Sequence, residues 1–222
     1  SELKDFFTAA DEKRFRGDQV FEWIYGHMAA SFDEMSTIPN YLRKKLNLYC
    51  ELNTLTLISS EQSQRTSTKK YLFKTQDDLI VESVIIPDPK RITLCISTQV
   101  GCPLDCQFCA TGLMGYKRNL SSAEIIDQFL MTSRDYGKNK ITNIVYMGMG
   151  EPLLNYANTL KTLQIFAEGK TKDISLRRLT VSTAGIAPKI IELADSGLKV
   201  KLALSLHSLF DETRNKIMPI NK

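Results

Sequence analysis

Apolar residues in the first 50 positions recur at the spacing of a helix. Val20, Ile24 and Met28 fall on one helical face. Pro39 is well placed to begin a second helix, because its fixed φ suits the first helical turn. The apolar stripe of that second helix consists of Tyr41, Leu42 and Leu46. We therefore predict a small helical domain over residues 1–50.

The pattern changes after residue 50. The runs 71–73 and 79–86 are rich in aromatic and β-branched residues, which favour strands. Pro87 and Pro89 follow the second run and are expected to end it. Residues 51–90 are therefore predicted to be a β-rich connecting segment.

From residue 91 to residue 222, strand-like and helix-like runs alternate. Ser121 and Glu124 have the spacing of a capping box, which marks the start of a helix. The other expected helices cover 156–166, 186–193 and 211–217, and the expected strands cover 92–96, 141–147, 178–182 and 200–206. Repeated β–α units predict an α/β fold with a parallel sheet, in which ligands bind at the carboxyl ends of the strands.

Composition narrows the class of protein. The chain is 43% hydrophobic and 24% charged, as in ordinary globular proteins. No apolar run approaches the roughly 18 residues of a membrane span. An odd count of five cysteines without a signal peptide at the start of the sequence favours free thiols in the cytoplasm. The net charge of +4 mildly favours a polyanionic partner, as do basic residues in the first 50 positions. These basic residues are Lys13, Arg14, Arg16, Arg43, Lys44 and Lys45.

The strongest chemical signal is a group of three cysteines. Cys102, Cys106 and Cys109 have the spacing C-x3-C-x2-C, with an aromatic residue before the third cysteine. A four-iron cluster normally has four thiolate ligands, so three leave one iron open to a substrate group. Zinc is the alternative, but a Cys3His site needs a nearby histidine, and His27 and His207 are both distant in sequence.

Candidate ligand-binding residues follow the later strands. The run from Met147 to Pro152 combines two glycines with Glu151, a carboxylate that can accept hydrogen bonds from an ammonium or a ribose group. Hydroxyl residues and an imidazole follow the next two strands. These residues are Ser182, Thr183, Ser205 and His207.

Together these motifs resemble one family, the bacterial 23S rRNA (adenine-C2) methyltransferases of the radical S-adenosylmethionine (SAM) superfamily. The resemblance includes the run 15–25 near the start, which is similar to the accessory domain of that family, and extends to Lys222 at the end. It implies a helical RNA-binding domain over 1–50, followed along the chain by a partial (β/α)6 radical SAM barrel over 91–222 with about four strands present. The other matching runs are 94–97, 99–102, 119–120, 142–143, 147–155, 205–207 and 219–222.

The resemblance also assigns roles to residues. The implied cofactors are a [4Fe-4S] cluster on Cys102, Cys106 and Cys109, and S-adenosyl-L-methionine. Glu82 matches the proton acceptor and Cys95 the resolving cysteine, whereas from the sequence alone both read as ordinary strand residues. Cys50 matches no functional position and is expected to be structural. The positions that match SAM contacts are Gly150, Glu151, Ser182, Ser205, Leu206 and His207.

The implied reaction methylates C2 of an adenosine in 23S rRNA and in tRNA. Adenine C2 is an electron-poor carbon that a polar methyl transfer does not reach. In the family, one SAM methylates a protein cysteine, and reductive cleavage of a second SAM at the cluster starts radical addition to C2. The implied partners are the RNA substrates and a one-electron donor such as flavodoxin, and the protein is expected to be a cytoplasmic monomer.

One departure from the family pattern is serious. The methyl-carrying cysteine of the family lies near the C-terminus, but no cysteine follows Cys109 here. We therefore expect the sequence to be a fragment, with an open edge strand and exposed apolar surface where the barrel is incomplete.

Three alternatives stay open at this point. One is the related adenine-C8 methyltransferase that confers antibiotic resistance. Another is a radical SAM enzyme of a different reaction type, such as a glycyl-radical activase, although Cys95 and the basic N-terminal helices argue against it. The third is a non-catalytic, zinc-bearing RNA-binding module.

Overall fold

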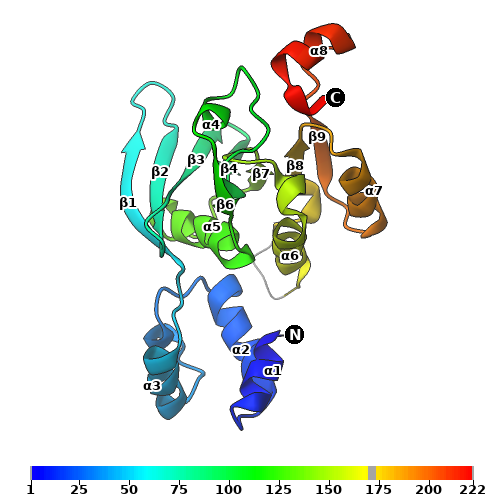
Figure 1. Cartoon of the computed structure of the whole chain (residues 1–222). Helices are drawn as coiled ribbons and strands as arrows, with labels where there is room; N and C mark the ends of the chain where they lie inside the picture. Colours follow the sequence, from blue (N-terminus) through cyan, green and yellow to red (C-terminus); the bar gives the residue numbers. More distant parts are fainter. Residues whose placement is uncertain (1, 170–173, 222) are drawn as a thin grey trace.

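Four parallel strands form the centre of the computed structural model, which describes residues 2–169 and 174–221 (Figure 1). Each strand pairs with the next one along the chain in this group. They are β4 (Arg91–Cys95), β7 (Asn143–Tyr146), β8 (Leu179–Thr183) and β9 (Lys201–Leu204). The connecting helices are α5 (Ser122–Tyr136), α6 (Tyr156–Ala167) and α7 (Ala187–Asp195). The α/β fold with a four-stranded partial barrel is therefore confirmed.

An antiparallel extension continues the same sheet. It consists of β1 (Leu55–Gln62), β2 (Lys69–Thr75) and β3 (Ile80–Asp88), and the sheet order is β1-β2-β3-β4-β7-β8-β9. Strand β3 ends at Asp88, directly before Pro89, as expected, but Pro87 does not end it and pairs with Ile92 of β4. Its pairing with β2 ends at Ile85, so the missing N–H of Pro87 breaks no bond on that side.

The N-terminal helices have an apolar core of their own. They are α1 (Glu2–Ala9), α2 (Phe15–Phe21) and α3 (Asn40–Tyr49), with a π-helical turn at Glu22–Gly26 and a 3-10 turn at Phe32–Glu34. Phe7, Val20 and Leu42 are buried in this core. Met28 was predicted to share a helical face with Val20, but it lies past the helix end at φ 53 and packs in the main core.

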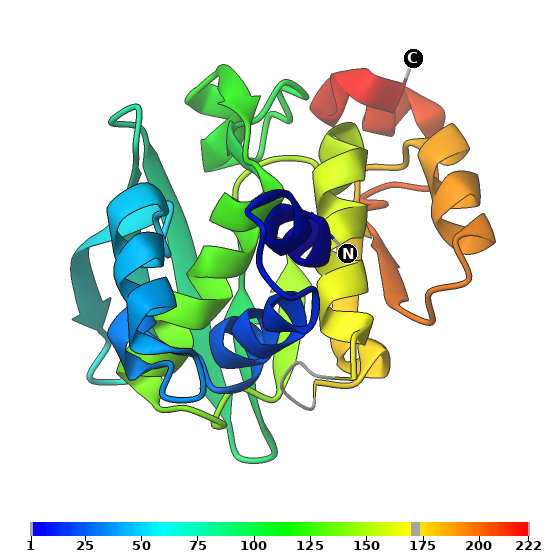
Figure 2. The same cartoon turned by 90° about the horizontal axis from the view of Figure 1, so that it is seen from below.

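Helices α5 and α6 lie between the sheet and the N-terminal helices (Figures 1 and 2). The capping box at the start of α5 is confirmed, because Ser121 and Glu124 exchange both of its hydrogen bonds. Ile125 and Phe129 of α5 pack in the main core with Phe73 and Leu94 of the sheet. The last helix, α8 (Asp211–Ile217), follows β9 and is succeeded by a 3-10 turn at Pro219–Asn221.

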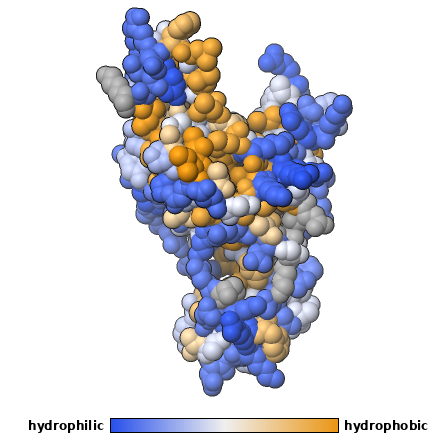
Figure 3. Space-filling model, turned by 90° about the vertical axis from the view of Figure 1, so that its right-hand side faces the viewer, coloured by the Kyte–Doolittle hydropathy of each residue, from blue (hydrophilic) through white to orange (hydrophobic). Residues whose placement is uncertain are grey.

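The expected open edge is present at β9, which is the last strand of the sheet order. Leu202 and Leu204 are 44% and 51% exposed there. Figure 3 shows apolar side chains gathered on this side of the molecule. Such an edge exposes both apolar surface and unpaired backbone groups.

A buried amide ties α5 to the sheet. Gln128 is 0% exposed, and its Oε1 accepts hydrogen bonds from Ser83 Oγ at 2.7 Å and from Ser97 N–H at 2.8 Å. Its Nε2 donates to Ser97 O at 2.9 Å. One side chain therefore satisfies three buried polar groups of β3 and of the chain after β4.

We predict that Gln128→Met destabilises the fold by about 2 kcal/mol or more, because buried polar groups lose their partner while the side-chain volume is kept. Urea unfolding, compared with the wild type, measures the change. Gln164→Met is the matched control, since Gln164 is exposed on α6. Equal unfolding free energies for the two variants would contradict the role given to Gln128.

Candidate active site

The three cysteines lie on a loop that a short hairpin closes. Strand β5 (Gln99–Gly101) pairs with β6 (Tyr116–Asn119), and Cys102–Cys109 and the short helix α4 (Ala110–Leu113) lie between them. The two ends approach so closely that a Cβ on Gly101, at φ +74, would lie 1.7 Å from Gly115 O. Glycine is therefore required at this neck. Neither the hairpin nor α4 was predicted.

The three thiols line one cavity of about 310 Å³. Each cysteine is partly buried. Burial raises the pKa of Cys102 and of Cys106, and the neighbouring cysteines and Glu151 raise it further. Thiolates at this place are therefore costly unless a positive charge lies between them.

This donor set fits an iron–sulfur cluster. Within residues 2–169 and 174–221, no group of three or more His, Cys, Asp and Glu side chains is arranged to hold one metal ion. Thiolates are the usual ligands of iron–sulfur clusters, and three cysteines line this one cavity.

Helix α8 covers one side of the cysteine loop. Gln107 N–H donates to Ile217 O at 3.0 Å. Met218 and Leu104 form an apolar cluster against which Cys102 and Cys106 pack. The Arg214 guanidinium donates to the carbonyl oxygens of Ala184 and Leu206, at the ends of β8 and β9. Sequence reasoning missed Arg214 and Met218, because their spacing in the sequence gives no signal.

Glu151 joins the ends of β7 and β8 inside the cavity. It is 4% exposed, and burial raises its pKa. Its Oε1 accepts from Leu153 N–H at 3.0 Å, and its Oε2 accepts from Ala184 N–H at 2.7 Å. The backbone thus fixes the direction of this carboxylate.

Most of the predicted cofactor-binding residues meet in this cavity. Gly150, Glu151, Ser182 and Ser205 line it with the three cysteines. The hydroxyl oxygens of Ser182 and Ser205 are 3.4 Å apart.

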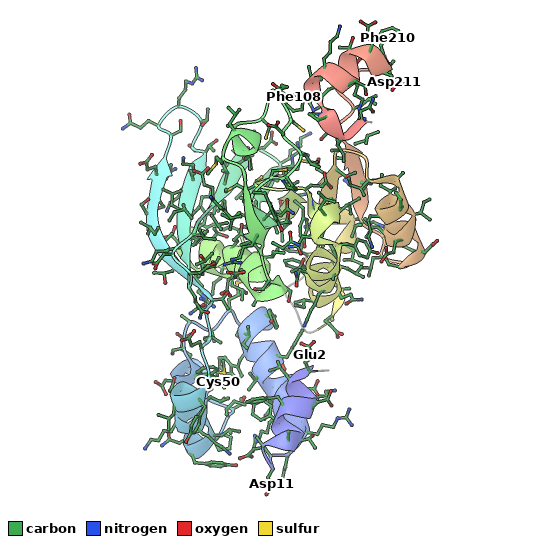
Figure 4. The ribbon with its side chains drawn as sticks, in the orientation of Figure 1. Glu2, Asp11, Cys50, Phe108, Phe210 and Asp211 are labelled. Carbon is green, nitrogen blue, oxygen red and sulfur yellow. The ribbon has the colours of Figure 1, made fainter. Side chains whose placement is uncertain are left out.

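The other two predicted positions, Leu206 and His207, are exposed outside the cavity lining. His207 adopts φ 59, and its ring centroid lies 4.1 Å from that of Phe108, which does line the cavity. Phe108 reaches from the cysteine loop toward α8 (Figure 4). His207 therefore belongs to the rim of the cavity.

Cys95 and Glu82 do not line the cavity, but they lie on the adjacent strands β4 and β3. Cys95 pairs with Val84 of β3 and with Val145 of β7. Burial raises the pKa of Cys95 to about 11, although a hydrogen bond from the backbone of Met147, a cavity residue, opposes that shift.

Glu82 and Val84 lie on the same face of β3, because side chains two residues apart point the same way. The side chains of Val81, Ser83 and Ile85 are buried on the other face. Lys70 Nζ lies 3.2 Å from Glu82 Oε1 in an ion pair. The face that carries Glu82 is therefore the one that carries Cys95.

Cys50 lies far from this site, in the N-terminal helical unit (Figure 4). It packs against the apolar core of that unit, and burial raises its pKa. This placement suits a structural residue.

Two family models match the chain. Residues 1–52 match the ribosomal RNA large subunit methyltransferase N-terminal domain, and residues 96–222 match the radical SAM superfamily. A crystal structure of a radical SAM methyltransferase from Sphaerobacter thermophilus superposes with a TM-score of 0.94 at 40% identity. That match covers 99% of this chain and 65% of the other chain.

The relatives are similar over the whole length of this chain. A probable dual-specificity RNA methyltransferase RlmN from Thermotoga neapolitana is 46% identical over 221 residues, which are 100% of this chain and 64% of the relative. The dual-specificity RNA methyltransferase RlmN of Alcanivorax borkumensis is 42% identical over 100% of this chain and 59% of its own length. The chain thus spans about 60% of the length of such relatives. With its three-cysteine loop on a partial barrel and the family model matching residues 96–222, the chain belongs to the radical SAM superfamily.

Proposed function

We propose that this chain is part of a radical SAM enzyme that methylates C2 of an adenosine in 23S rRNA and in tRNA. The observation that carries the proposal is the single cavity lined by three cysteines, Glu151, Ser182 and Ser205. Similarity along the whole chain to dual-specificity RNA methyltransferases supports it. These relatives favour neither the adenine-C8 reaction nor a non-catalytic zinc module.

The [4Fe-4S] cluster would be held by Cys102, Cys106 and Cys109. S-adenosyl-L-methionine would be held by Gly150, Glu151, Ser182 and Ser205, with Leu206 and His207 at the rim of the cavity. When both are bound, the cluster supplies the electron for reductive cleavage of S-adenosyl-L-methionine. This chemistry suits adenine C2, which has neither an acidic hydrogen nor a nucleophilic lone pair.

The protein's own contribution at the cavity is to bind and orient. Two backbone N–H groups and the Thr183 side chain donate to the Glu151 carboxylate, which keeps lone-pair capacity to accept a hydrogen bond from an ammonium group. Because Glu151 is buried, such a bond forms away from bulk water and is stronger for it. The two serine hydroxyls supply further donors and acceptors at the ends of β8 and β9.

We assign Glu82 the role of accepting the proton from C2 and Cys95 that of the resolving thiol. Their shared face of the sheet beside the cavity supports both roles. Lys70 donates to one oxygen of Glu82 and leaves the other for the proton. The methyl-carrying cysteine would come from the part of the relatives that these 222 residues do not span.

We also propose three units: a helical RNA-binding unit over 1–50, a β-rich connection over 51–90 and the partial barrel over 91–222. The match of residues 1–52 to a ribosomal RNA methyltransferase domain supports RNA binding by the first unit. The net charge of this unit does not support RNA binding, because residues 1–52 contain seven Lys and Arg but nine Asp and Glu. This unit packs beyond α5 and α6, so it would contact RNA away from the target base (Figure 2).

The remaining partners and the location follow the same proposal: a one-electron donor such as flavodoxin, a monomeric state and a cytoplasmic location. None of the helices within the described residues is both long and apolar enough to cross a membrane.

We predict that Cys106→Ser abolishes iron incorporation, because a cluster held by only two thiolates is lost readily. Iron and sulfide analysis after anaerobic reconstitution measures this effect. Cys50→Ser is the matched control and should keep wild-type iron content, since Cys50 lies in the N-terminal core. Full iron content in the Cys106 variant would overturn the cluster assignment. So would a wild-type protein that holds zinc instead of iron.

We predict that Glu82→Gln lowers RNA methylation by about 100-fold or more while cleavage of S-adenosyl-L-methionine continues, because only the proton acceptor is lost. The assay uses the protein together with the C-terminal part that the relatives possess. Mass spectrometry measures 2-methyladenosine in 23S rRNA fragments and in tRNA, and chromatography measures the cleaved cofactor. Glu61→Gln, exposed on β1, is the control. Methylation of both RNAs within threefold of wild type by the Glu82 variant would refute the assignment.

A further inference from the structure

The chain after β4 and the chain after β7 are locked together by buried hydrogen bonds. The N–H groups of Thr98 and Gln99 both donate to Met149 O, at 2.9 and 3.1 Å. In return, Met149 N–H donates to Ser97 Oγ at 2.8 Å. Gln99 Oε1 accepts from Glu151 N–H at 2.8 Å. Side chains of the first segment thus hold the backbone that carries Glu151.

The two glycines of the second segment fit these side chains. A Cβ on Gly148 would lie 2.6 Å from Ser97 Oγ, and a Cβ on Gly150 would lie 2.4 Å from Gln99 Cβ. Gly150 also adopts φ +94, which other residues rarely adopt. Glycine at both positions therefore lets the two segments approach, and Gln99 occupies the space that a side chain at position 150 would need.

Gln99 also reaches back to the hairpin that closes the cysteine loop. Its Nε2 donates to Asn119 Oδ1 at 2.8 Å, and Asn119 is its partner across β5 and β6. Tyr116 OH donates to the same oxygen at 3.2 Å. Gln99 is only 1% exposed, so water cannot replace either of its bonds. One amide therefore connects the base of the cysteine loop with the backbone of Glu151.

We propose that Gln99 is a positioning residue that sets the Glu151 carboxylate at the correct place relative to the three cysteines. Gln99 does not line the cavity, so it acts through Glu151. The inference rests on the proposed function, in which Glu151 binds the amino group of S-adenosyl-L-methionine beside the cluster. A displacement of the Glu151 turn would separate that carboxylate from the open iron and weaken binding without removing any thiol.

The test is Gln99→Met, which keeps the length of the side chain and removes both hydrogen bonds. We expect the Gln99→Met variant to keep the iron content of the wild type after reconstitution. We expect it to bind S-adenosyl-L-methionine about tenfold more weakly, because the buried Glu151 N–H loses its acceptor. A titration of the reduced-cluster electron paramagnetic resonance signal measures this affinity. Gln62→Met, at an exposed position of β1, is the matched control.

Hydrogen–deuterium exchange of the protein without cofactors gives a second readout. We expect faster exchange at residues 149–151 in the Gln99 variant, with no change in β7. General destabilisation would instead raise exchange in both segments. If Gln99→Met does not fold, Asn119→Ala removes the shared acceptor of Gln99 Nε2 and Tyr116 OH but keeps the bond between Gln99 and Glu151 N–H, and we expect it to weaken binding about threefold.

Unchanged affinity in a folded Gln99 variant that holds iron would overturn the positioning role, as would unchanged affinity in Asn119→Ala where that variant is the test. A wild-type protein whose reduced-cluster signal ignores S-adenosyl-L-methionine would be a failure of the proposed function instead. The two failures are therefore distinguished by the wild-type titration.

Discussion

The parallel pairing of β4 with β7 is the contact on which the rest of the site depends. It continues past the strand ends, where Ile96 N–H donates to Val145 O and Gly148 N–H donates to Ile96 O. This pairing places the chain that leads into the cysteines beside the chain that leads into Glu151. The pairing of β7 with β8 then brings Ala184 within hydrogen-bond distance of Glu151. A shift of register at β4 would separate the thiols from the carboxylate, even if every residue were kept.

The sequence predicted those parts that depend on local pattern. Alternating strand and helix runs predicted the parallel strands, because each element must bury one apolar face. The capping box predicted the start of α5, and the cysteine spacing predicted three thiols around one cavity. The role of Gln99 lies beyond such reasoning, although it stands in a motif that the sequence showed. Its partners at positions 119 and 151 are brought together only by tertiary structure.

Short and strained elements were missed for a different reason. Strands β5 and β6 have three and four residues, too few to show a period. Met28 lies past the end of the helix in a left-handed backbone conformation, which a methionine in the sequence does not predict. Arg214 of α8 donates to the carbonyl oxygens of Leu206, eight positions away, and of Ala184, 30 positions away. Such features depend on how elements pack, and one sequence carries little information about packing.

We propose that three thiolates hold a cluster with one open iron next to Glu151. Mössbauer spectroscopy of protein reconstituted with ⁵⁷Fe, with and without S-adenosyl-L-methionine, tests it most directly. We expect one iron of the four to change its signal when S-adenosyl-L-methionine is added, while the other three keep thiolate-bound signals. Four irons with unchanged signals in both samples, or a protein that forms no cluster, would contradict it.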